Sequence, residues 1–195
     1  AAIYSKEDLI INGNGTLNVN AGYRNGIKST DDCIIVSGTL NITSTEDGII
    51  GKDLCGIVAG DININAGSDG VKSTYDTDTT KGNVIIEGGN ITIKASNDGI
   101  QAENILVIND GTINIKTNNG AADTTQTHID NMDMGRGGFG FNNNKTTTTT
   151  DDTSESRKGI KAGNMLIIND GDITIDSDDD SVHCNSVIYI YMVVL

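Results

Sequence analysis

The stretch Asp69-Gly70-Val71-Lys72-Ser73 returns as Asp98-Gly99-Ile100-Gln101-Ala102 and, less closely, at four other places in the chain. The second residues of the six copies are Gly26, Gly48, Gly70, Gly99, Gly159 and Ser181. They lie 22, 22, 29, 60 and 22 residues apart, so three intervals define a 22-residue period. The longer two contain one period plus an insert, at 74–81 and 121–157. Self-similarity at such a period is typical of solenoid proteins.

Each period contains three short segments rich in β-branched residues, separated by Gly, Asn, Asp or Ser. Alternation of this kind between turn formers predicts strands. We therefore expect an all-β, right-handed, single-stranded parallel β-helix, in which residues 1–195 form one domain with three strands per coil and roughly six to seven coils. Stacked equivalent residues give aliphatic interior columns, one of which is Ile27, Ile49, Val71, Ile100, Ile160 and Val182.

The chain carries 27 acidic and 13 basic residues, a formal net charge of −14. This balance argues against nucleic acid and anionic membrane surfaces as partners and favours cations. No apolar run approaches the roughly 20 residues of a membrane-spanning helix, so we expect no membrane insertion.

Several of these features occur together in one known family. The Asp-Gly-Ile repeats, the strands around Gly-Thr, the Lys72-Ser73-Thr74 insert with Asp76 and Asp78, and the Met/Gly/Phe-rich insert before Lys158 resemble the secreted bacterial carbohydrate-binding β-helix proteins, which are similar in fold to pectate lyases. The resemblance runs from about Leu9 to Ser186. It implies bound calcium, an extracellular or cell-surface location, and attachment to plant cell-wall polysaccharides of the cellulose or pectin type without lyase chemistry.

Asp47, Asp69 and Asp98 occupy one column of the repeat, with Asn25 before them and Asp180 near the end. Stacked carboxylates about 5 Å apart repel one another, and Ca²⁺ would relieve the repulsion with its preference for oxygen ligands. We expect calcium at this edge, with Asp76 and Asp78 of the first insert as further ligands. The alternative is that each Asp caps its own turn through backbone N–H groups.

Two outward columns are candidates for carbohydrate binding. Lys28, Lys72, Gln101 and Lys161 form a partly basic row that would meet uronate carboxylates, or would simply neutralise the neighbouring Asp column. A second face presents Asn41, Asn63 and Asn114 among threonines, either to a glycan or as ladders that solvate the face.

A self-assembling structural or adhesive solenoid, forming fibres or surface layers, is the alternative function. One strand carries apolar residues on its outward side as well: Ile34, Ile85, Val107, Ile167 and Tyr189. Such a face is normally covered, here by residues 121–157 or by another subunit, and open β-helix ends would also pair with another chain.

A polysaccharide lyase is the third hypothesis, and it would need an arginine beside the metal. Arg24, Arg136 and Arg157 all lie away from the densest acids, so we expect no catalytic residues. Cys33 and Cys55 stack one period apart, which fits either a disulfide or two core thiols.

Overall fold

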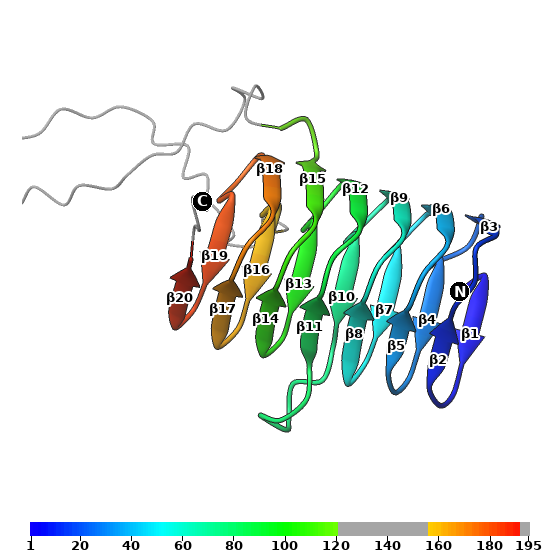
Figure 1. Ribbon diagram of the computed structural model, residues 1–195, viewed down its shortest axis with the longest axis horizontal. Coiled ribbons are helices and arrows are strands. Elements are labelled where there is room, and N and C mark those ends of the chain that lie inside the picture. Colours follow the sequence, from blue (N-terminus) through cyan, green and yellow to red (C-terminus); the bar gives the residue numbers. More distant parts are fainter. Residues whose placement is uncertain (121–155, 192–195) are drawn as a thin grey trace, which may run out of the picture.

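The computed structural model of the chain is a solenoid of parallel strands, and it describes residues 1–120 and 156–191 (Figure 1). The chain passes through three sheets in turn, here named A, B and C, and one passage makes one coil. Every pairing within each sheet is parallel, and register partners such as Ile27 and Ile49 lie one sequence period apart. The expected parallel β-helix is confirmed.

The strands of the three sheets have the following bounds. Sheet A contains β1 (Ile3–Ser5), β4 (Ile27–Ser29), β7 (Ile49–Gly51), β10 (Val71–Ser73), β13 (Ile100–Ala102), β16 (Ile160–Ala162) and β19 (Val182–Cys184). Sheet B contains β2 (Leu9–Ile11), β5 (Cys33–Ile35), β8 (Leu54–Ile57), β11 (Asn83–Ile86), β14 (Ile105–Ile108), β17 (Met165–Ile168) and β20 (Val187–Ile190). Sheet C contains β3 (Thr16–Ala21), β6 (Thr39–Ser44), β9 (Asp61–Ala66), β12 (Asn90–Ala95), β15 (Thr112–Thr117) and β18 (Asp172–Asp176).

Three edges run along the solenoid where the chain turns from one sheet to the next. We name them the A/B, B/C and C/A edges after the sheets that they join. Successive coils are hydrogen-bonded neighbours, so equivalent turn residues on one edge stack at the strand spacing of about 4.8 Å. Any functional group repeated in the sequence therefore becomes a row along an edge or a face.

The interior is built from the predicted aliphatic columns. Ile27, Ile49, Val71, Ile100 and Ile160 are all fully buried. Cys33 and Cys55 are register partners within this core, and both are free thiols. Burial raises the pKa of Cys33 to about 12, so these side chains pack as small, uncharged apolar groups.

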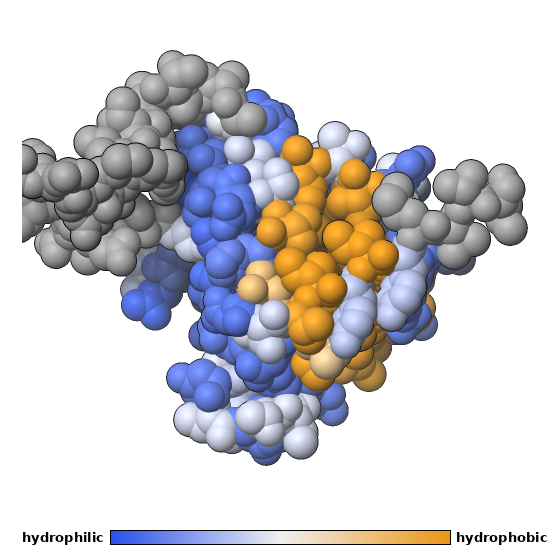
Figure 2. Space-filling view, turned by 90° about the vertical axis from the view of Figure 1, so that its left-hand side faces the viewer, coloured by the Kyte–Doolittle hydropathy of each residue, from blue (hydrophilic) through white to orange (hydrophobic). Residues whose placement is uncertain are grey.

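The outward side of sheet B carries the apolar residues that the sequence places there, and those of its middle strands are half-buried. Figure 2 shows apolar side chains gathered at the end of the β-helix where β20 lies. There the inward-facing Ile188 and Ile190 are 41% and 51% exposed. The predicted cover from 121–157 falls almost wholly outside the described residues, so covering and self-association stay predictions.

The insert at 74–81 leaves the A/B edge between β10 and β11 as a projecting loop (Figure 1). The ring of Tyr75 lies under the ammonium groups of Lys52 and Lys81, at 4.6 and 5.0 Å from its centroid. No helix in the part of the chain that the structure describes is long and apolar enough to cross a membrane.

Candidate functional site

The predicted acidic column forms a hydrogen-bonded ladder along the C/A edge. A side-chain oxygen of each member accepts the backbone N–H of the next coil: Asn25 from Asp47 at 3.2 Å, Asp47 from Asp69 at 3.1 Å, Asp69 from Asp98 at 3.0 Å, and Asp98 from Lys158 at 2.8 Å. One oxygen of each carboxylate therefore caps the turn of the next coil, whereas the alternative drawn from the sequence had each Asp cap its own turn.

Two lysines of the predicted basic row neutralise this ladder. Lys72 Nζ lies 2.6 Å from Asp69 Oδ2, and Lys161 Nζ lies 3.2 Å from Asp98 Oδ2. The Asp69 and Asp98 side chains are only 5% and 1% exposed. Burial raises the pKa of Asp69 despite the neighbouring lysine. Burial alone would lower the pKa of Lys72, but the charge of Asp69, its hydrogen bond and the charges of Asp47 and Glu103 together raise it.

The rest of the row is mixed. Gln101 donates a hydrogen bond to Glu103 at 3.1 Å. Lys28 has no ion pair with any residue that the structure describes. Among the described residues, Lys28 is therefore the lysine of this row that has no carboxylate partner.

The other predicted calcium ligands lie apart from the ladder's centre. Asp180 is exposed and contacts His183 Nδ1 at 2.9 Å and Lys158 Nζ at 3.4 Å. Asp78 accepts hydrogen bonds from the backbone N–H and hydroxyl of Thr80, and Asp76 is exposed in the same loop. This loop follows β10, whereas Asp69 precedes it, so the loop carboxylates lie on the A/B edge and not beside Asp69.

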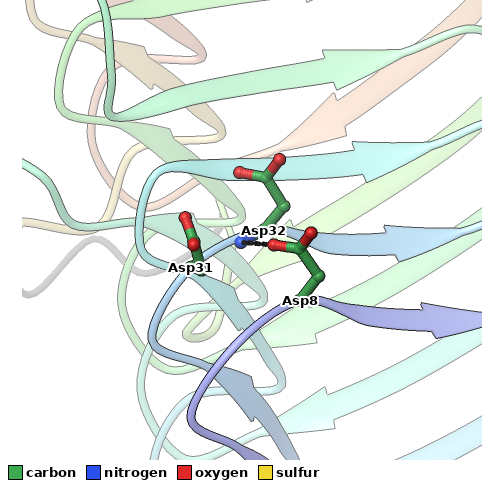
Figure 3. A group of neighbouring side chains, drawn as sticks. All are labelled: Asp8, Asp31 and Asp32. Carbon is green, nitrogen blue, oxygen red and sulfur yellow. Dashed lines mark hydrogen bonds between the residues drawn. The ribbon is translucent and has the colours of Figure 1, made fainter.

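The A/B edge holds a different acidic group, which the sequence analysis missed. Within the described ranges, one oxygen from each of Asp8, Asp31 and Asp32 lies within 4.8 Å of the others (Figure 3). Asp8 follows β1, and the other two follow β4 one coil later, so the parallel stacking of turns brings them together. Asp8 Oδ1 also accepts the backbone N–H of Asp32 at 3.3 Å.

The electrostatics of this A/B acidic group favour a cation. A hydrogen bond with Asp53, followed by burial and the charges of neighbouring aspartates, raises the pKa of Asp31. Burial and the charge of Asp8 raise the pKa of Asp32. Lys81 offsets part of this charge from the insert through an ion pair with Asp53. Three carboxylates at this spacing offer the hard oxygen donors that Ca²⁺ prefers.

The outward face of sheet C carries the predicted polar array. Asn41 donates to Asn18 at 2.9 Å and Asn63 donates to Asn41 at 3.1 Å, so these three amides form a ladder. A shallow depression of about 280 Å³ lies over Asn41, Asn63, Thr92 and Lys94. Asn114 continues the face on β15 as an exposed residue. The amides of this face therefore form the predicted ladder, and binding of a glycan to the face stays a prediction.

The two arginines that the structure describes are engaged by carboxylates. Arg24 Nε lies 3.8 Å from Glu46, and an Arg157 guanidinium nitrogen lies 2.8 Å from Asp178. Arg136 lies outside the described residues.

These features define a class: a parallel β-helix whose polar columns run along the solenoid axis on its outer surface. Residues 1–192 match the family model of the carbohydrate-binding domain-containing proteins, and the chain belongs to that family. The resemblance seen in the sequence is thereby confirmed at the level of the family.

Two relatives agree with this assignment. A carbohydrate-binding domain-containing protein of Acetivibrio thermocellus is 45% identical over 42 residues, which are 22% of this chain and 15% of that protein. The structure of a polysaccharide lyase-like protein from C. thermocellum, a gadolinium derivative, superposes with a TM-score of 0.59 and 25% identity. It covers 96% of this chain, which spans about half (52%) of the neighbour's length.

Proposed function

We propose that the protein is a non-catalytic, extracellular or cell-surface β-helix that binds polysaccharides of the plant cell wall, of the cellulose or pectin type. The observation that carries the proposal is the match to the carbohydrate-binding family over residues 1–192. The outer columns of amides, hydroxyls and carboxylates supply the hydrogen-bonding groups that such ligands need.

Affinity electrophoresis tests this function directly. The protein is run through native gels that contain polygalacturonate, hydroxyethylcellulose or no glycan, each with and without a chelator. We expect retardation in at least one glycan gel relative to the blank. Migration that matches the blank in every gel would contradict polysaccharide binding and shift support to self-assembly.

A separate assay tests whether the protein has lyase activity. Lyases release unsaturated products that absorb in the ultraviolet, and we expect no rise in absorbance when the protein is incubated with polygalacturonate and calcium. A steady rise that scales with protein concentration would instead establish a lyase.

Calcium is the second part of the proposal, and we place it at Asp8, Asp31 and Asp32. The support is the gathered oxygens of the three carboxylates. A hydrogen bond with Asp53 raises the pKa of Asp31, burial raises the pKa of Asp32, and the charges of neighbouring aspartates add to both shifts. An ion that binds only the folded state stabilises it by about 2.7 kcal/mol at a hundredfold excess over Kd. Asp69 and Asp98 fit an ion less well, because their oxygens already contact lysine and backbone groups.

Thermal unfolding with added calcium and with a chelator locates the ion. We expect calcium to raise the melting temperature of the wild type and of Asp69→Asn, but to have little effect on Asp32→Asn. A calcium response lost in Asp69→Asn and kept in Asp32→Asn would return the site to the C/A edge. No response in the wild type would remove calcium from the proposal.

A further inference from the structure

The B/C edge contains a groove that none of the expected site residues occupies. Its volume is about 770 Å³, and its floor is formed by the stacked glycines Gly60, Gly89, Gly111 and Gly171 of four successive coils. All four have positive φ values, between 108° and 126°. A Cβ added at Gly60 would lie 2.6 Å from the carbonyl oxygen of Gly38, so only glycine fits this floor without strain.

The glycine floor gives the groove its shape. A Cβ added at Gly89, Gly111 or Gly171 would likewise lie 2.9, 3.0 or 2.8 Å from the carbonyl oxygen of the preceding glycine in the row, so the missing side chains let the coils stack closely here. Four stacked coils contain three spacings of about 4.8 Å, so the groove follows the solenoid axis for roughly 14 Å. That is longer than a single sugar ring and suits a chain that runs parallel to the axis.

The walls of the groove present hydrogen-bond acceptors. Asp110 and Asp170 each use one carboxylate oxygen to accept the N–H of the following glycine, at 2.6 and 2.8 Å. Their second oxygens have no partner among the residues that the structure describes, and neither does the carboxylate of Asp172. Ionised carboxylates only accept hydrogen bonds, so they are complementary to the O–H donors of a sugar.

An aromatic ring stands at one end of this row. Tyr191 lines the groove, its side chain is 53% exposed, and its ring stacks on Tyr189 with centroids 6.3 Å apart and planes 8° from parallel. Its backbone N–H donates to Ile168 at 2.8 Å, which continues the sheet B ladder by one residue. An exposed, backbone-anchored ring beside polar groups offers a surface for the C–H face of a sugar.

The charge of the groove selects among glycans. Among the described residues that line it are four aspartates, including Asp61, and no Lys or Arg. A polyuronate would place its own carboxylates against these acids and be repelled. Among the described residues, three carboxylate oxygens gather within 4.8 Å of one another at Asp8, Asp31 and Asp32 on the A/B edge and not in this groove.

We propose that the groove at the B/C edge binds a neutral, hydroxyl-rich polysaccharide chain along the solenoid axis. Aspartate oxygens accept its hydroxyl protons and Tyr191 packs against a ring face. The inference rests on the proposed polysaccharide-binding function and adds to it a site and a ligand class.

Affinity electrophoresis of the full chain in hydroxyethylcellulose tests the groove. We expect Tyr191→Ala, and separately Asp110→Ala/Asp172→Ala, to raise Kd by about tenfold. Tyr23→Ala is the matched control, because it removes an exposed tyrosine that does not line the groove. Melting temperatures verify that each variant is folded.

A charge-removal variant provides a second, independent readout. Asp110→Asn/Asp170→Asn/Asp172→Asn keeps polar groups on the wall and removes three negative charges. We expect its affinity for polygalacturonate to rise relative to that for hydroxyethylcellulose at low salt, where repulsion is least screened. An unchanged preference between the two glycans would contradict the role given to these charges.

The failures of the groove and of the proposed function are distinguishable. If Tyr191→Ala and Asp110→Ala/Asp172→Ala both bind hydroxyethylcellulose with wild-type affinity, the neutral glycan binds elsewhere. That result would overturn the groove proposal and leave polysaccharide binding intact. Binding of polygalacturonate without binding of hydroxyethylcellulose would overturn the neutral ligand class. Binding of neither glycan by the wild type would overturn the proposed function and the groove together.

Discussion

The C/A and B/C edges both carry rows of aspartates, yet the two rows are used differently. On the C/A edge, Asp69 and Asp98 are buried, each with one oxygen on a backbone N–H and the other on a lysine. On the B/C edge, Asp110 and Asp170 are exposed, and each leaves one oxygen without a described partner. The same residue type therefore holds the coils together on one edge and faces solvent on the other, because burial and a partnered lysine are present on one edge alone.

The largest effect should come from breaking the buried row. We expect Asp98→Ala to lower the free energy of unfolding by about 3 kcal/mol, because Lys161 loses its buried partner and the Lys158 N–H loses its acceptor. Asp98→Asn should cost about 1 kcal/mol, since an amide oxygen still caps the turn as that of Asn25 does. Urea unfolding measures both, and equal losses would show that the capping bond contributes little.

The glycine floor of the exposed row should be the next most sensitive feature. Gly60→Ala is expected to destabilise the protein by more than about 1 kcal/mol, because its φ of 122° and its contact with Gly38 exclude a Cβ. Gly22→Ala is the control, with no atom within 4 Å of the added carbon, and should stay within about 0.5 kcal/mol of wild type. A Gly60→Ala protein as stable as the control would mean that the turns of this edge relax easily.

A smaller, pH-dependent effect is expected at the A/B acidic group. The raised pKa values of Asp31 and Asp32 mean that the folded state binds protons at a higher pH than the unfolded chain does. The contribution of these groups to the free energy of unfolding therefore rises as pH falls from 7 towards 4. In chelator, Asp31→Asn/Asp32→Asn should be more stable than wild type at pH 7, and the difference should close on acidification.

Thermal unfolding of the two proteins across this pH range, without calcium, isolates that contribution from other titrating groups. A difference that stays constant with pH would show that the two carboxylates do not titrate abnormally. A difference that widens on acidification would give the opposite sign to the pKa shifts.

The smallest effect should come from the exposed row of the B/C edge. Asp172→Asn has no described ion pair or hydrogen bond to lose and should change the free energy of unfolding by no more than about 0.5 kcal/mol. Denaturant unfolding beside Asp98→Asn checks this. A loss as large as that of Asp98→Asn would remove the contrast between the two edges.

The candidate sites were less predictable from sequence than the fold. The Asp column was visible because its members share the Asp-Gly motif, but the partner of each carboxylate was not, since Lys161 reaches the aspartate of the preceding coil. The A/B acidic group was not predicted, because the expected calcium ligands lay in the repeated Asp-Gly motif and in the first insert. Its signal was present as Asp8 and Asp32, 24 residues apart and thus close to one period.

The sequence by itself determined the solenoid, because a 22-residue period of β-branched residues and turn formers has to stack its apolar positions to bury them. It also determined which residues share a column, since parallel coils in register place equivalent positions side by side. Only the tertiary structure decided which carboxylates are neutralised, which gather and which line a groove. Those outcomes depend on the direction of each side chain and on the backbone path of each turn, and a periodic sequence specifies neither.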